Sequence, residues 1–124
     1  MQLSIVSLLE EFLVASNFAG LAFGTAGCGT VHAMAYPLGG QYHVAHGESN
    51  YACFTGVMKQ YMALRQDGEI SVLNDFLAKC LACACEEVYE KLEDLLNRIL
   101  PKKKLHEYGV KQEELAEFAK SVID

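Results

Sequence analysis

Apolar positions recur at helical spacing along most of this chain, beginning near its start. In residues 4–26, Leu9, Phe12 and Leu13 follow this spacing. Four alanines form a stripe of small residues in the same segment: Ala15, Ala19, Ala22 and Ala26. The pattern predicts a long helix over residues 4–26, which the glycines on either side of Cys28 end. The alanine stripe suits either a close helix neighbour or a tightly packed core.

Two further helices are predicted in the first half of the chain. Thr30 is a suitable cap for a short helix, and Pro37 with the glycine pair at 39–40 is expected to stop it. A loop over residues 41–46 then leads into a helix over residues 49–65. This loop would have to reverse the chain if the two helices are to pack on each other.

The second half of the chain is also helical in pattern. Residues 66–68 predict a turn, and apolar periodicity over residues 72–100 predicts one or two helices with a break at 83–85. Residues 101–104 are expected to be a solvated connector, and residues 110–123 a final amphipathic helix. Because no strand alternation and no internal repeat occur, the predicted fold class is all-α, a helical bundle.

Charge is distributed unevenly over the 124 residues. Residues 1–58 contain no Lys or Arg, and all ten basic residues lie between Lys59 and Lys120. A solvated surface normally carries charges of both signs, so we expect the first half to be buried inside something larger than this chain. The net charge of −6 argues against a nucleic-acid partner, which requires a basic face.

The stretch from Phe12 to Gly47 has no charged residue, so a membrane span has to be considered. Polar residues such as Ser16 and Asn17 interrupt it, and no basic residue precedes Lys59. No positive segment opens the chain as in a secretory signal. Five cysteines, an odd number, favour reduced thiols. We therefore expect a cytoplasmic protein with no membrane partner.

Three of the four histidines, His32, His43 and His46, lie within fifteen residues. Neutral imidazole is a common ligand of divalent metals. His32 and His46 are too far apart in sequence to share one helix face, so only the loop between them can bring them together. Their spacing suits either a metal site or hydrogen-bonded core histidines. Two histidines are also fewer than the three protein ligands of a typical catalytic metal site.

The cysteines offer a rival site. Cys80, Cys83 and Cys85 form a C-x₂-C-x-C pattern that is compatible with a thiol-based metal carrier or with redox chemistry. Cys80 and Cys83 share a helix face, whereas Cys85 points elsewhere, so packing as small apolar residues is the favoured interpretation. Cys28 lies one turn before His32 and either approaches the same site or packs.

Two segments carry a family resemblance. Residues 19–47, AGLAFGTAGCGTVHAMAYPLGGQYHVAHG, closely resemble the second signature of the iron-containing (group III) alcohol dehydrogenases. Residues 36–44, continuing through residues 50–51 to 54–55, look like the 4-hydroxybutyrate dehydrogenase branch of that family, and so do residues 89–105 with 107–110. The resemblance covers nearly the whole chain, and the histidine-containing signature is specific.

The resemblance implies a fold and a ligand set. Members have an N-terminal α/β nucleotide-binding domain and a C-terminal helical domain, so residues 1–124 would be part of that helical (dehydroquinate synthase-like) metal-binding domain, without the nucleotide-binding domain. Fe²⁺ or Zn²⁺ has four protein ligands in the family: an Asp and a His one helical turn apart, then two histidines that map onto His32 and His46. The first pair would lie before Met1.

The resemblance also implies an activity, the NAD(P)-dependent oxidation of 4-hydroxybutyrate to succinate semialdehyde or the reverse, with a small alcohol or aldehyde as the substrate. Tyr36 stands where many members carry a His near the nicotinamide. His43 is a candidate for proton relay or for the substrate carboxylate, or it is a solvated loop residue. Ala45 replaces the Pro that usually precedes the second ligand.

A second hypothesis starts from what the chain lacks. Without the other ligand pair and the nucleotide-binding domain, the chain by itself would be a non-catalytic, truncated helical module. The apolar helix over residues 4–26 would then expose a patch larger than monomers tolerate, so we expect a homo-oligomer.

Overall fold

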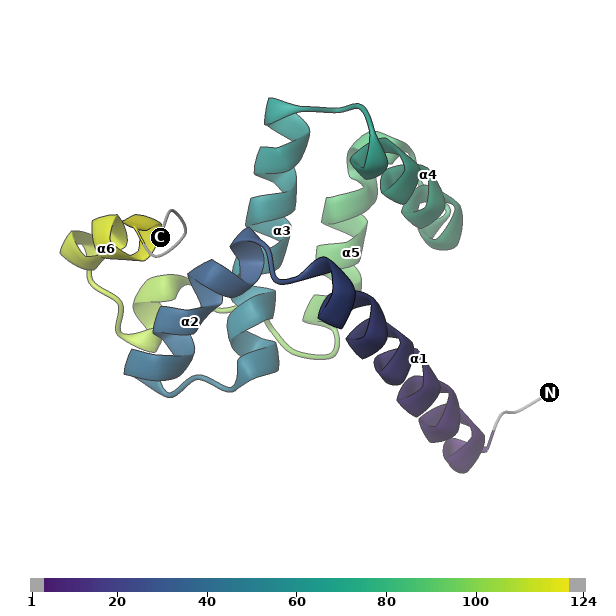
Figure 1. Ribbon diagram of the computed structural model, residues 1–124, viewed down its shortest axis with the longest axis horizontal. Coiled ribbons are helices and arrows are strands. Elements are labelled where there is room, and N and C mark those ends of the chain that lie inside the picture. Colours follow the sequence, from purple (N-terminus) through teal and green to yellow (C-terminus); the bar gives the residue numbers. More distant parts are fainter. Residues whose placement is uncertain (1–3, 121–124) are drawn as a thin grey trace.

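The computed structural model describes residues 4–120, and every regular element within them is helical (Figure 1). The α-helices are α1 (Ile5–Ala26), α2 (Thr30–Tyr42), α3 (His46–Leu64), α4 (Glu69–Leu81), α5 (Val88–Asn97) and α6 (Leu115–Lys120). Short 3₁₀ segments are η1 (Cys85–Glu87), η2 (Leu105–Tyr108) and η3 (Gln112–Glu114). The all-α prediction is confirmed.

Helix α1 projects away from the other helices (Figure 1). The Ser4 hydroxyl caps its start by accepting from the Ser7 N–H at 3.2 Å, and it ends at Gly27, whose φ of 80° favours glycine. The predicted bounds are confirmed, yet none of its residues is buried. By length and apolar composition alone, α1 is also able to cross a membrane.

Helix α2 corrects two predictions. Thr30 is its first residue and not its cap, which is Gly29, and the helix continues through Pro37 and the glycine pair at 39–40 to Tyr42. A proline inside a helix costs about 3 kcal/mol. Leu38, next to Pro37, is completely buried in a core shared with α3 and α6, and burial of a leucine returns about 1.5–3 kcal/mol. The burial of Leu38 therefore offsets much of the cost of Pro37, and Ala35 of the same helix is buried as well.

The predicted loop over residues 41–46 shrinks to residues 43–45. His43 adopts a left-handed conformation with φ of 55°, and the Val44 N–H donates to the Leu38 carbonyl at 3.1 Å, which closes the helix end. Helix α3 then begins at His46, three residues earlier than predicted.

Helix α3 contributes side chains to both hydrophobic cores found in residues 4–120. Its Cys53 packs with Leu38, Val110 and Phe118 in one core. Its other side contributes Met58 and Met62 to a second core that is built on α4 and α5. Because α3 carries both His46 and these core residues, the packing of the whole bundle positions the candidate site.

The second half largely follows the sequence pattern. The turn at 66–68 and the break at 83–85 are confirmed, since α3 ends at Leu64 and α4 ends at Leu81. The last helix is shorter than predicted: residues 110–111 are not helical, and residues 112–114 form η3 before α6. Residues 121–123 of that prediction lie outside the described residues.

Candidate metal centre

The rings of His32 and His46 lie together, with centroids 5.5 Å apart and planes tilted by 43°. His32 is in the first turn of α2, and His46 is the first residue of α3. The short connection at 43–45 reverses the chain, and packing of α2 on α3 brings the two imidazoles to one place.

This separation suits two imidazoles on one divalent ion. With metal–nitrogen bonds of about 2.0–2.1 Å, two histidines on a tetrahedral ion have ring centroids about 5 Å apart. No group of three or more His, Cys, Asp or Glu side chains that could hold a metal occurs in residues 4–120. The two histidines therefore fit as a part of a ligand set, and the described chain supplies no third ligand.

An apolar cavity of about 430 Å³ adjoins His32. The residues that line it come from α2, α3 and α5 and from the preceding loop: Gly29, Thr30, Val31, His32, Asn50, Tyr51, Phe54, Tyr61 and Leu96. Phe23 of α1 stacks on His32, with centroids 5.8 Å apart and 12° between the planes. The imidazole thus has apolar surroundings on two sides, which lowers the local dielectric constant.

Asn50 contacts His46 one helical turn away on α3. Its Nδ2 donates to the His46 carbonyl at 2.9 Å and lies 3.2 Å from Nε2 and 3.4 Å from Nδ1 of the ring. Its Oδ1 is buried and has no hydrogen-bond partner. No sequence motif pointed to a role for Asn50; the available signal was its position four residues after a candidate ligand.

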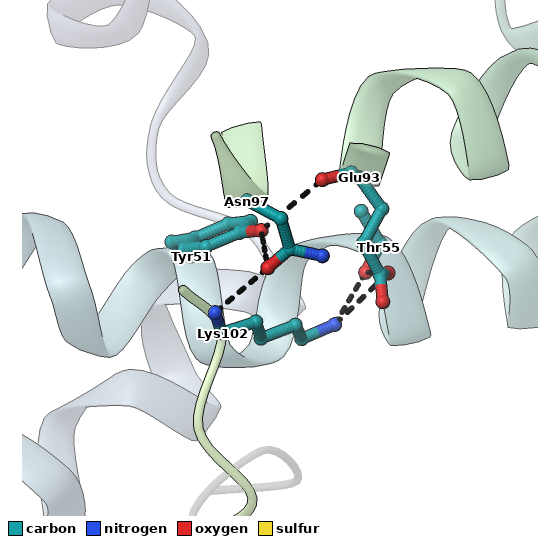
Figure 2. A network of polar contacts seen from close by, with 5 residues as sticks. All are labelled: Tyr51, Thr55, Glu93, Asn97 and Lys102. Atoms are coloured by element: carbon teal, nitrogen blue, oxygen red, sulfur yellow. Dashed lines mark hydrogen bonds and ion pairs between the residues drawn. The ribbon is translucent and has the colours of Figure 1, made fainter. Parts of the chain in front are cut away.

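A polar network fixes α3 to α5 and to the connector at 101–104 (Figure 2). The Tyr51 hydroxyl donates to Asn97 Oδ1 at 3.0 Å, and the same oxygen accepts from the Lys102 N–H at 2.7 Å. The Thr55 hydroxyl donates to Glu93 and accepts from Lys102 Nζ, which lies 3.2 Å from Glu93 Oε2. The expectation of a solvated connector is therefore wrong for Lys102, whose side chain is only 20% exposed.

The electrostatics of this network follow from its contacts. The hydrogen bond from Thr55 and the pairing with Lys102 lower the pKa of the Glu93 carboxyl. Burial, together with the Glu93 charge, raises the pKa of Tyr51. The network therefore keeps Glu93 ionised and Tyr51 as a hydrogen-bond donor at the wall of the apolar cavity.

Tyr36 and His43 are not among the residues that line this cavity. Tyr36 lies one turn after His32 on α2 and is 63% exposed. His43 is exposed at the end of α2. The structure brings His32 and His46 together, and the roles of Tyr36 and His43 stay predictions.

The cysteines of the rival site lie at the α4–α5 break. Cys83 and Cys85 pack against the core of α4 and α5, and the Cys85 thiol donates to Asp75 Oδ1 at 3.3 Å. This hydrogen bond raises the pKa of Cys85, which disfavours the thiolate that a metal requires. Cys80 and Cys28 are exposed. For Cys83 and Cys85, these contacts support the packing interpretation.

Known proteins resemble this chain along most of its length. The sequence profile "Fe-containing alcohol dehydrogenase family, C-terminal" matches residues 6–124. The chain is 49% identical over 119 residues to 4-hydroxybutyrate dehydrogenase of Clostridium kluyveri, which covers 96% of this chain and 32% of that protein. It is 28% identical over 123 residues to lactaldehyde reductase of Escherichia coli, covering 93% of this chain and 31% of that protein.

A shorter segment of the chain matches another protein at higher identity. Long-chain-alcohol dehydrogenase 1 of Geobacillus thermodenitrificans is 63% identical over 43 residues, which is 35% of this chain and 11% of that protein. The chain spans about a third of the length of the relatives that it matches over most of its residues. No solved structure matches this chain significantly.

Proposed function

We propose that this chain, which belongs to the Fe-containing alcohol dehydrogenase family, is part of a metal- and NAD(P)-dependent enzyme that interconverts 4-hydroxybutyrate and succinate semialdehyde. Family membership supports the dehydrogenase chemistry. The 49% identity to 4-hydroxybutyrate dehydrogenase supports the substrate class, a short ω-hydroxy acid. In this proposal, residues 1–124 form part of the C-terminal helical, dehydroquinate synthase-like domain.

The observation that carries the proposal is the closeness of the His32 and His46 rings, whose centroids lie 5.5 Å apart. We assign them as two of the protein ligands of Fe²⁺ or Zn²⁺. When bound, such an ion supplies a Lewis acid for the substrate oxygen, and NAD(P) supplies the hydride acceptor. The apolar lining of the cavity beside His32 would disfavour water next to the substrate, and Phe23 stacks on the imidazole.

Two further residues have proposed roles near this centre. Tyr36 would face the nicotinamide, since it follows His32 by one turn on the same face of α2. His43 would relay a proton or bind the substrate carboxylate from the left-handed turn that precedes His46. The enzyme would be cytoplasmic, with a small alcohol or aldehyde as substrate and without a nucleic-acid or membrane partner.

A pair of matched histidine variants tests the proposal. In the protein as its gene encodes it, we expect His46→Ala to remove bound metal and to reduce NAD-dependent oxidation of 4-hydroxybutyrate at least 100-fold. His106→Ala is the control, because His106 is exposed in η2, away from the cavity. Undiminished activity and unchanged metal content in His46→Ala would refute the proposed role of this residue.

A second candidate function is a non-catalytic helical module that self-associates. Two observations favour it. Helix α1 has no buried residue, and residues 4–120 contain no group of three or more side chains that could hold a metal. This candidate predicts no dehydrogenase turnover and only weak metal binding by the 124-residue chain. Tight binding of one Zn²⁺ to a monomer of that chain would contradict it.

A further inference from the structure

The first turn of α2, which carries His32, follows a helix that packs little against the bundle. Phe23 of α1 stacks on the His32 ring, but α1 itself has no buried residue. Gly29 is the N-cap of α2, so no side chain of the described chain caps the start of this helix. The position of His32 therefore depends on contacts that its turn makes with the rest of the bundle.

A tyrosine near the far end of α3 reaches this turn. The Tyr61 hydroxyl donates to Thr30 Oγ1 at 2.7 Å, within the usual range for an O–H···O bond. Tyr61 lies three residues before the end of α3, and Thr30 is the first residue of α2, two residues before His32. The bond therefore ties the start of α2 to the helix whose first residue is His46.

The turn that carries His46 is held by other contacts. Glu48, in the first turn of α3, accepts from the Tyr108 hydroxyl at 3.1 Å and from Lys103 Nζ at 3.2 Å. These partners belong to η2 and to the connector at 101–104, and not to α2. The two histidine-bearing turns are thus fixed from different parts of the chain, and a change at Tyr61 acts on the turn of His32.

A metal ion binds most tightly where its ligands already lie in the ligating arrangement. A bond that favours this arrangement before the ion arrives raises the fraction of molecules that are ready to bind, and its loss lowers the apparent affinity by that fraction. The free energy of one hydrogen bond limits the effect to about 2- to 10-fold in affinity. Tyr61 is 38% exposed, so water replaces a part of the lost bond and keeps the effect within this range.

We propose that Tyr61 is the positioning residue of His32: its hydroxyl, through Thr30, holds the first turn of α2 so that the His32 ring lies next to that of His46 before a metal binds. This inference rests on the proposed function, in which both histidines are metal ligands. Tyr61 acts through Thr30 and is not itself a metal ligand.

The zinc affinity of single and double variants tests this role. Competition with a chromogenic chelator measures the dissociation constant of Zn²⁺ for the protein as its gene encodes it. We expect Tyr61→Phe and Thr30→Val each to raise this constant about 2- to 10-fold, because each removes the same hydrogen bond with little change in volume. The double variant should bind no more weakly than either single variant, since the bond is lost only once.

The same series contains the results that would contradict the pairing. Thr30→Ser keeps the acceptor and should bind zinc more tightly than Thr30→Val does. If the two effects multiply in the double variant, or if Thr30→Ser binds as weakly as Thr30→Val, the Tyr61–Thr30 bond does not position His32 and the proposal is overturned.

Tyr89→Phe is the matched control. The Tyr89 hydroxyl donates to Asn74 Oδ1 at 2.6 Å in the core of α4 and α5, so this variant loses a bond of similar length in the other core. Tyr61→Phe and Tyr89→Phe should both lower the free energy of unfolding in urea, whereas Tyr89→Phe should leave the zinc affinity unchanged. If both variants weaken zinc binding equally, the cause is a general loss of stability and the positioning role is overturned.

The ring-proton resonances of His32 in the metal-free protein give a second readout. We expect one sharp set in the wild type and broadened or multiple sets in Tyr61→Phe, because the first turn of α2 then samples several positions. Zinc should restore a single set in this variant, since the ion selects the ligating arrangement. One sharp set in metal-free Tyr61→Phe, or broadened resonances in the metal-free wild type, would overturn the proposal.

The outcomes also distinguish this inference from the proposed function. If His32→Ala retains zinc as firmly as the wild type, the metal assignment of His32 and the role of Tyr61 fail together. If His32→Ala loses zinc while Tyr61→Phe retains it, the positioning role alone is overturned and the metal assignment of His32 stands.

Discussion

The ring of Phe23 lies almost parallel to the imidazole of His32, with 12° between the planes and 5.8 Å between the centroids. Phe23 belongs to α1, the helix that otherwise projects away from the bundle (Figure 1). This stacking is the contact through which α1 touches the candidate metal centre. The orientation of His32 therefore depends in part on where α1 lies.

Removal of this ring should affect His32 and little else. We expect Phe23→Ala to cost about 0.5–1.5 kcal/mol of stability, the usual contribution of an aromatic pair, and to shift the His32 ring-proton resonances as the ring current disappears. Phe18→Ala, at a more exposed position of α1, is the control. If the His32 resonances do not move, the two rings do not stack in solution.

Exposed apolar side chains along α1 predict self-association of the 124-residue chain. Phe12 and Leu13 are 65% and 72% exposed, in a helix without a buried residue. An apolar patch of this length is covered by another surface in stable proteins. We expect an oligomer by light scattering and a monomer for the double variant Phe12→Lys, Leu13→Lys. Ile99→Lys, a comparably exposed site outside α1, should stay oligomeric; a monodisperse wild-type monomer would contradict the prediction.

The buried hydroxyl of Thr55 is expected to contribute strongly to stability. It donates to Glu93 and accepts from Lys102, and Val fills nearly the same volume without these bonds (Figure 2). Since a hydrogen bond to a charged group is worth about 1.5–3 kcal/mol, Thr55→Val should lose a free energy of unfolding in this range in urea titrations. Thr25→Val, on exposed α1, should change it by less than about 0.5 kcal/mol. If Thr55→Val and Thr25→Val change the free energy of unfolding equally, the hydrogen bonds of Thr55 contribute nothing to stability.

The Glu93 carboxyl predicts a specific dependence of stability on pH. Its pKa is lowered from the ordinary value of 4.5 by the Thr55 hydrogen bond and by Lys102. A group with a lowered folded-state pKa stabilises the fold above its ordinary pKa, and this contribution is lost as the pH falls through the lowered value. Between pH 7 and pH 3, the wild type should therefore lose more stability than Glu93→Gln does. If stability falls equally with pH in the wild type and in Glu93→Gln, Glu93 does not contribute in this way. Glu11→Gln on α1 is the control, and its stability should depend on pH as that of the wild type does.

Local signals predicted the helices where no strong packing opposed them. Gly27 ends α1, the break at 83–85 separates α4 from α5, and the His32–His46 pair was identified from the residues and from the family resemblance. At Pro37 the local signal failed, because α2 continues through the proline and buries the neighbouring Leu38 against α3 and α6, which offsets much of the cost of a proline within a helix.

The amino-acid sequence by itself determined the helical class, the family and the two candidate ligands, because periodicity and short motifs are properties of neighbours along the chain. Only the tertiary structure decided that residues 43–45 make the reversal, that Lys102 joins Thr55 and Glu93, and that Asn50 faces His46 with an unpaired oxygen. These relationships depend on how α2, α3 and α5 pack, and packing is a balance of burial and hydrogen bonding summed over residues far apart in the chain.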